Sequence, residues 1–153
     1  MKSDARVRYT KMVIKNSFVK LLAKKPLTKV TVKEICELSE INRATFYKYY
    51  CDPYDLLEKL ENEFLEELEN NVSQSIHNGF QETFTYILIS IKAEGELYKT
   101  LFSENGDPHF PSRIFASCYK KYASMEDDKR FQQLKPSEQK FFFTLLHKVA
   151  VVF

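Results

Sequence analysis

The sequence has few of the residues that make tight turns: only three glycines and five prolines occur in 153 residues. This supply is small for a multi-stranded sheet, whose strands are joined by Gly- and Pro-rich turns. Apolar residues recur mainly at spacings of three and four, the helical period. With 44% hydrophobic and 29% charged residues, the chain is predicted to be globular and all-α, with one core or two small lobes that share a long helix.

The sequence also lacks the motifs of metal, cofactor and catalytic sites. Its three cysteines are odd in number and widely spaced, which predicts neither a disulfide framework nor a Cys-x-x-Cys site and favours a reducing, cytoplasmic location. The histidines lie in three different segments, without a paired ligand spacing. No G-x-S-x-G and no Gly-rich phosphate loop occur. We therefore expect no metal, no cofactor and no enzymatic activity. The residues concerned are Cys36, Cys51, Cys118, His77, His109 and His147.

Long apolar runs are missing as well. No run of about 18 apolar residues is present, so the sequence predicts no membrane-spanning helix and no membrane partner. The N-terminal MKSDARVRYTK lacks the apolar core of a signal peptide.

Charge is distributed unevenly along the chain. Residues 1–50 hold 12 Lys and Arg against four Asp and Glu, a net charge of +8, whereas residues 51–153 hold 11 against 17, a net charge of −6. Lysines on solvated helix faces are common in any protein, but an excess confined to the first third favours a polyanionic partner for that part.

The stretch TVKEICELSEINRATFYKYYCDPYDLL, residues 31–57, predicts two short helices and the start of a third. Thr31 and Glu34 have the spacing of a capping box. Asn42 is an N-cap candidate for the second helix. Asp52 and Pro53 form a cap and first-turn proline for the third helix.

Within the second helix, Phe46 and Tyr50 are four residues apart and are predicted to face inward. The opposite face carries Arg43, Ala44, Thr45, Tyr47 and Lys48. A helix-turn-helix places such a face in the DNA major groove, where Arg and Lys bind guanine edges or phosphates and Tyr hydroxyls bind phosphates. The spacing alone is equally typical of a surface corner in any small α-protein, and both interpretations stay open at this point.

The rest of the chain also has helical periodicity. We expect a first helix over residues 4–25, ended by Pro26, and a long helix over 53–75. A lobe boundary is expected at His77-Asn78-Gly79, and the remaining helices at 80–92, 96–103, 111–125 and from 136 onward. The last helix is apolar on nearly every side, which predicts burial at a subunit interface.

Over about residues 6–60 the sequence resembles the TetR family of bacterial transcriptional regulators, with INRATFYKYY as the recognition helix and DPYDLL opening the fourth helix. The phrase INRATFY is most similar to the branch that includes regulators of dihydroxyacetone kinase genes. The resemblance implies a DNA-binding head at 1–52, a connecting helix at 53–76 and a C-terminal dimerisation and effector lobe at 77–153. It places DNA contacts on Thr31, Asn42, Arg43, Ala44, Thr45, Tyr47, Lys48 and Tyr49.

The sequence departs from the family pattern at three places. Pro53 stands where the family has a phosphate-contacting lysine, and Glu40 replaces the turn glycine, where a left-handed residue would be strained. The chain stops at Phe153 inside an apolar helix, so the resemblance implies a reduced or truncated C-terminal lobe.

The function expected from the resemblance is that of a homodimeric, ligand-responsive repressor of an inverted-repeat operator in double-stranded DNA. A small-molecule effector would bind among aromatic residues, although such residues are also typical of an ordinary core. The alternative is a co-regulator of the same shape that acts through protein contacts, with weak or no DNA binding. The candidate effector residues are Phe84, Phe102, Phe115, Tyr119 and Tyr122.

Overall fold

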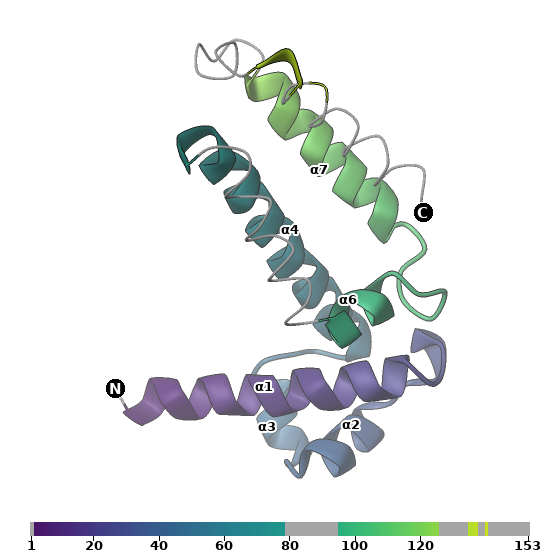
Figure 1. The fold of residues 1–153 in the computed structure, drawn as a ribbon. Helices are drawn as coiled ribbons and strands as arrows, with labels where there is room; N and C mark the ends of the chain where they lie inside the picture. Colours follow the sequence, from purple (N-terminus) through teal and green to yellow (C-terminus); the bar gives the residue numbers. More distant parts are fainter. Residues whose placement is uncertain (1, 79–94, 126–134, 138–139, 141–153) are drawn as a thin grey trace. The chain divides into compact units, whose positions relative to one another are not determined.

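The computed structural model describes residues 2–78, 95–125, 135–137 and 140. Helices are the only regular elements in these residues, which confirms the all-α prediction for this part of the chain. The α-helices are α1 (Lys2–Leu22), α2 (Val32–Ser39), α3 (Arg43–Tyr47), α4 (Pro53–Asn78), α6 (Gly95–Leu101) and α7 (Phe110–Met125), and the short 3₁₀ turn η1 covers Leu27–Lys29 (Figure 1).

The described residues form two compact units, and the division falls inside α4. The first unit contains residues 2–61 and 96–107, and the second contains the rest of α4 and the chain from Pro108 onward. The sequence-based boundaries, after residues 52 and 76, differ from this division. The first unit includes the first turns of α4, and it also contains most of α6, which the sequence assigned to the C-terminal lobe.

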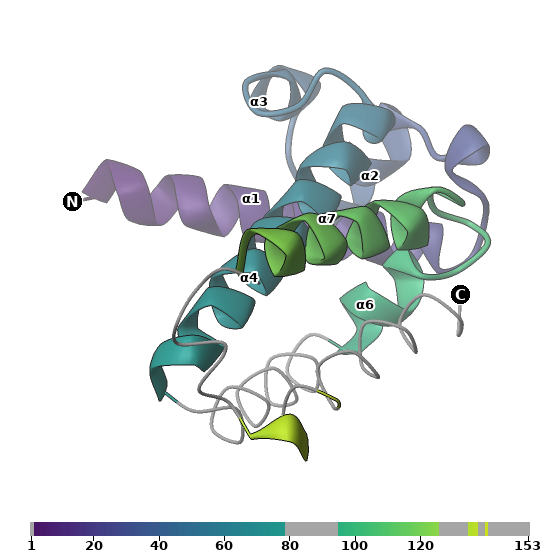
Figure 2. The same ribbon diagram turned by 90° about the horizontal axis from the view of Figure 1, so that it is seen from above.

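The first unit is built on α1, which contacts α2, and α2 in turn contacts α3. In the two views α3 and α6 lie on opposite sides of α1 (Figures 1 and 2). Phe46 and Tyr50, which the sequence predicts to face inward, are buried, while Val7, Leu21 and Val32 are half-buried. The most buried large apolar side chains of this unit are Ile14, Phe18, Leu22, Ile35, Phe46, Leu56 and Leu101.

Helix α1 ends earlier than predicted, at Leu22 instead of residue 25. The backbone winds on through the N–H groups of Lys24 and Lys25, which both donate to the carbonyl of Leu21 at 3.0 and 3.2 Å. Sharing one carbonyl between two donors is common where a helix tightens at its end. The residue before a proline also disfavours the α conformation, so Pro26 forces the chain out of the helix.

In the second unit, α4 and α7 run side by side in the same direction. The Phe64 and Phe110 rings meet edge to face with centroids 5.6 Å apart. Arg113 donates to Asn62 Oδ1 at 3.0 Å, and further along both helices the Ser117 hydroxyl donates to Glu69. Phe110 and Ile114 are buried at this contact.

Two predicted helices, at 80–92 and from 136 onward, lie outside the described residues apart from residues 136, 137 and 140. The subunit interface expected on the last helix falls outside them too.

Candidate nucleic-acid interface

Helix α2 begins at the capping box that the sequence predicted. The Thr31 hydroxyl oxygen accepts from the Glu34 N–H at 3.3 Å, and Glu34 Oε2 accepts from the Thr31 N–H at 3.1 Å. Lys25 adds an ion pair of 2.6 Å to the same glutamate. The hydrogen bond from Lys25, followed by those from Thr31, lowers the pKa of Glu34 to about 2. The start of α2 is therefore tied to the end of the α1 connection.

The turn after α2 is a Schellman motif centred on Glu40. The Ile41 N–H donates to the Cys36 carbonyl at 3.1 Å and the Glu40 N–H donates to that of Glu37 at 3.4 Å, the bond pattern of this motif. Glu40 has φ 56° and ψ 36°, and among the described residues it is the only non-glycine with a positive φ. The expectation of a left-handed residue at this position is thus confirmed.

Helix α3 begins at Asn42, whose Oδ1 accepts from the Thr45 N–H at 2.7 Å. It is shorter than predicted. The sequence suggested a helix reaching Tyr50, but α3 ends at Tyr47, and the chain continues as one turn in which the Tyr49 and Tyr50 N–H groups donate to the Phe46 carbonyl.

The two faces of α3 separate as predicted. Phe46 is fully buried and Tyr50 is 5% exposed, and the centroids of their rings are 5.6 Å apart. On the other face Arg43, Ala44 and Lys48 are exposed, and Tyr47 is 57% exposed. Thr45 and Tyr49 are half-buried. We call the set Arg43, Ala44, Thr45, Tyr47 and Lys48 the α3 face.

The α3 face suits a polyanion chemically. It holds two cations and a phenol hydroxyl, and no acidic residue occurs between Glu40 and Asp52. Arg presents a planar fork to guanine or phosphate, and Tyr donates to phosphate. The first acid that precedes α3 in the sequence is the exposed Glu40, in the turn before the helix.

Two of the predicted DNA contacts have structural tasks in this geometry. The Thr31 hydroxyl donates to Glu34 Oε2 at 2.7 Å in addition to accepting its N–H bond, and Asn42 Oδ1 is engaged in the α3 cap. Their role in binding stays a prediction, whereas their role in starting α2 and α3 is direct.

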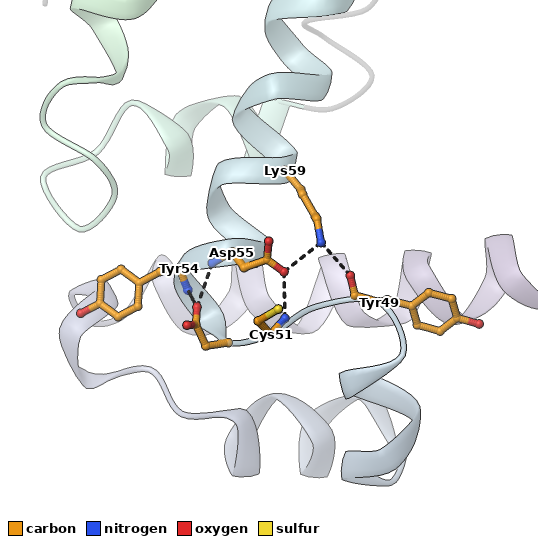
Figure 3. A network of polar contacts seen from close by, with 6 residues as sticks. Tyr49, Cys51, Tyr54, Asp55 and Lys59 are labelled. Carbon is orange, nitrogen blue, oxygen red and sulfur yellow. Dashed lines mark hydrogen bonds and ion pairs between the residues drawn. The ribbon is translucent and has the colours of Figure 1, made fainter.

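A polar network fixes the junction between α3 and α4 (Figure 3). Asp52 Oδ1 accepts from the Tyr54 and Asp55 N–H groups at 2.8 Å, which confirms Asp52 as the cap of α4. Asp55 Oδ2 accepts from the Cys51 N–H at 2.8 Å and from Lys59 Nζ at 2.9 Å. Lys59 also donates to the Tyr49 carbonyl at 2.9 Å.

Sequence reasoning missed Lys59, although Asp55 and Lys59 have the i, i+4 spacing of a helical ion pair. The carboxylate of Asp55 raises the pKa of Lys59, and Lys59 followed by the Cys51 N–H lowers that of Asp55. The ammonium also lies 5.3 Å from the centre of the Tyr50 ring. One side chain thus joins α4 to the last turn after α3.

The candidate effector residues are not assembled into a site by the described geometry. Phe102 is half-buried in the first unit, after α6. Phe115, Tyr119 and Tyr122 are positions on α7, of which the structure describes the backbone but not these side chains, and Phe84 lies outside the described residues.

The described part of the chain holds no group of three His, Cys, Asp or Glu side chains that could bind a metal ion. Cys36 is buried against the core, and this burial raises the pKa of its thiol. In the same part of the chain, no helix is both long and apolar enough to cross a membrane.

Comparisons of the chain with protein-family models, curated proteins and solved structures found no match. A functional assignment therefore depends on the residues of the α2–α3 corner and on its surface chemistry.

Proposed function

We propose that this chain is a sequence-specific DNA-binding transcriptional regulator, with α2 and α3 as a helix-turn-helix and the α3 face as its reading surface. The observation that carries the proposal is the α3 face itself: Arg43, Tyr47 and Lys48 are exposed on a short helix whose opposite side is anchored by a fully buried Phe46. The net charge of +8 over residues 1–50 supports it, because phosphate neutralisation dominates DNA affinity.

The residues of the α3 face have separate tasks in this proposal. Arg43, at the start of α3, reads a guanine edge, and Ala44 allows the helix to approach the groove. Lys48 and the Tyr47 hydroxyl bind phosphates and set the register. Lys59 and the Asp55 carboxylate hold the turn after α3 in place, so that the α3 face keeps one orientation against α4.

The wider proposal is a repressor that acts as a homodimer on an inverted repeat. Two heads separated by one helical turn, about 34 Å, would enter successive major grooves. A small ligand in the C-terminal part would bias the dimer away from this spacing. The support for this wider proposal is the TetR resemblance, and a solution mass measurement tests the dimer directly.

The decisive experiment selects binding sequences from a randomised double-stranded DNA pool and measures affinity by fluorescence anisotropy at several salt concentrations. Arg43→Ala is expected to lower the binding free energy by about 1–3 kcal/mol and to relax the preference at one base position. Lys48→Ala should weaken binding to all sequences alike and reduce the slope of log affinity against log salt concentration by about 1. Lys99→Ala is the matched control, because Lys99 is an exposed lysine on α6, across α1 from α3.

One observation favours a second candidate, the co-regulator. Glu40 places an exposed carboxylate in the turn that precedes α3, and an acid there disfavours phosphate contact. If the wild-type chain selects no sequence from the pool, and Arg43→Ala with Tyr47→Ala leaves affinity and salt dependence unchanged, the reading surface is wrongly assigned and the co-regulator is preferred.

A further inference from the structure

Residues 96–107, which comprise most of α6 and the chain after it, contact the α1 connection through Asn105. Residues 96–107 belong to the first unit, and α6 buries Leu97, Tyr98 and Leu101. Helix α6 lies on the other side of α1 from α3 (Figures 1 and 2), and Arg43, Tyr47 and Lys48 of the α3 face are exposed. Asn105 contributes two hydrogen bonds to this attachment.

Asn105 bonds to both ends of the connection that leaves α1. Its side-chain Nδ2 donates to the carbonyl of Leu22, the last residue of α1, at 2.9 Å. Its backbone carbonyl accepts from the N–H of Leu27, the first residue of η1, at 2.9 Å. The Leu22 carbonyl lies in the last turn of a helix, where carbonyl groups have no intrahelical N–H donor. Asn105 supplies that missing donor.

The connection between Leu22 and Leu27, which Asn105 holds at both ends, also contacts α2. Lys25 lies within the connection and forms the 2.6 Å ion pair with Glu34. Glu34 is half of the capping box that starts α2. A change at Asn105 can therefore reach the α2–α3 corner through the α1 connection, without touching α3.

Asn105 is followed by Gly106, one of two Asn-Gly pairs in the chain; the other is Asn78-Gly79. Glycine has no side chain to hinder its own backbone nitrogen, so this nitrogen can attack the preceding Asn Cγ. The N–Cγ bond forms, the Cγ–Nδ2 bond breaks, and ammonia leaves with the proton of the glycine N–H. Solvent water then opens the succinimide ring at either carbonyl and yields aspartate or isoaspartate.

The attached conformation restrains both reacting groups. The Gly106 N–H donates to the Ser103 carbonyl at 3.1 Å, while the Asn105 amide is held by Leu22. Cyclisation requires both bonds to open, so the reaction should follow the local opening of the segment.

The product cannot restore the attachment. An ionised carboxylate only accepts hydrogen bonds, so it would meet the Leu22 carbonyl without a proton between them. It would also place a negative charge at the negative end of the α1 dipole. Isoaspartate lengthens the main chain by one carbon and displaces the carbonyl that Leu27 needs.

We propose that Asn105-Gly106 is a self-modification site, at which deamidation follows the opening of segment 96–107 and then prevents it from reattaching to the α1 connection. The attached segment keeps the asparagine intact, and each opening exposes it to conversion. This proposal does not depend on DNA binding, so it can fail or succeed separately from the proposed function.

The first experiment measures deamidation at Asn105 by mass spectrometry in the full chain and in a peptide spanning residues 101–110. The folded chain is expected to convert at least about tenfold more slowly than the peptide, with the rate rising in low urea in parallel with hydrogen exchange of the Leu27 N–H. Equal rates in chain and peptide, or a rate that does not follow Leu27 exchange, would overturn the proposal.

The second experiment compares Asn105→Asp, Asn105→Ala and the control Asn16→Asp, an exposed position on α1. Asn105→Asp should accelerate Leu27 exchange about tenfold or more, Asn105→Ala should have a smaller effect, and Asn16→Asp none. If Asn105→Asp does not fold, the wild-type chain is aged instead, and its aspartate form is separated by ion exchange and measured in place of the variant. If the Leu27 N–H of the aspartate form exchanges at the wild-type rate, the proposed effect of the modification is refuted.

Discussion

Replacing Glu40 by glycine is expected to stabilise the chain, because Glu40 has a backbone conformation that a side chain disfavours. At φ 56° and ψ 36° the Cβ is close to the following carbonyl, which costs about 1–2 kcal/mol for an L-residue. Glycine avoids this cost but loses about 0.5–1 kcal/mol more backbone entropy on folding. The net gain is the difference between these two terms, about 0–1.5 kcal/mol.

Urea unfolding followed by circular dichroism gives the measurement. Glu40→Gly should raise the midpoint without changing the slope, since the surface exposed on unfolding is the same. Glu40→Ala removes the same charge and keeps the strained conformation, so it should gain little. Glu40→Asn should lie between them, because asparagine tolerates the left-handed region.

The DNA affinity of the same three variants separates charge from backbone strain. Each loses the carboxylate beside the α3 face, so each should bind the selected DNA more tightly and by a similar factor. Stability is therefore expected to follow the order Gly, Asn, Ala, while affinity is expected to be equal among the three. If Glu40→Ala stabilises as much as Glu40→Gly, the backbone argument is refuted and the charge is responsible.

Three further predictions test the frame around the α3 face. Because the pKa of Glu34 is about 2 in the folded chain against an ordinary 4.5, its stabilising effect is complete above pH 4.5 and is lost as the pH falls toward 2. Glu34→Gln should reduce the change of the urea midpoint with pH between pH 4.5 and 2. Glu37→Gln, on the same helix, should leave that pH dependence as it is in the wild type. Lys59→Met should accelerate hydrogen exchange at the Cys51 N–H, because Asp55 loses the partner that positions it; an unchanged rate would contradict the role of Lys59. Phe46→Ala should lower the free energy of unfolding by about 3–5 kcal/mol, since its ring is fully buried, and a loss below 1 kcal/mol in urea unfolding would refute its core position.

The capping residues and the inward face of α3 could be predicted from the sequence because they depend on neighbours three or four residues away. Thr31 with Glu34, Asn42 with Thr45, and Phe46 with Tyr50 all have this short range. Helical geometry alone brings such pairs together. The left-handed conformation of Glu40 was expected on different grounds, from the turn glycine of the family that residues 6–60 resemble.

The ends of α1 and α3 were predicted less well. Periodicity extended α1 to residue 25 and the second short helix to Tyr50. The observed ends depend on which donors the last carbonyls find and which acceptors the last N–H groups find. One such donor is Lys59 on α4, which donates to the Tyr49 carbonyl after α3. The spacing of apolar residues does not carry this information.

The sequence by itself determined the helical class, the caps of α2, α3 and α4, and the residues that α3 presents and buries. The tertiary structure alone decided that the division of the chain falls within α4, that residues 96–107 join the first unit, and that Asn105 closes the α1 connection from 83 positions away. The physical reason is the range of the interactions: caps and faces arise within one turn of helix, whereas the bond from Asn105 to Leu22 joins residues that no local geometry brings together.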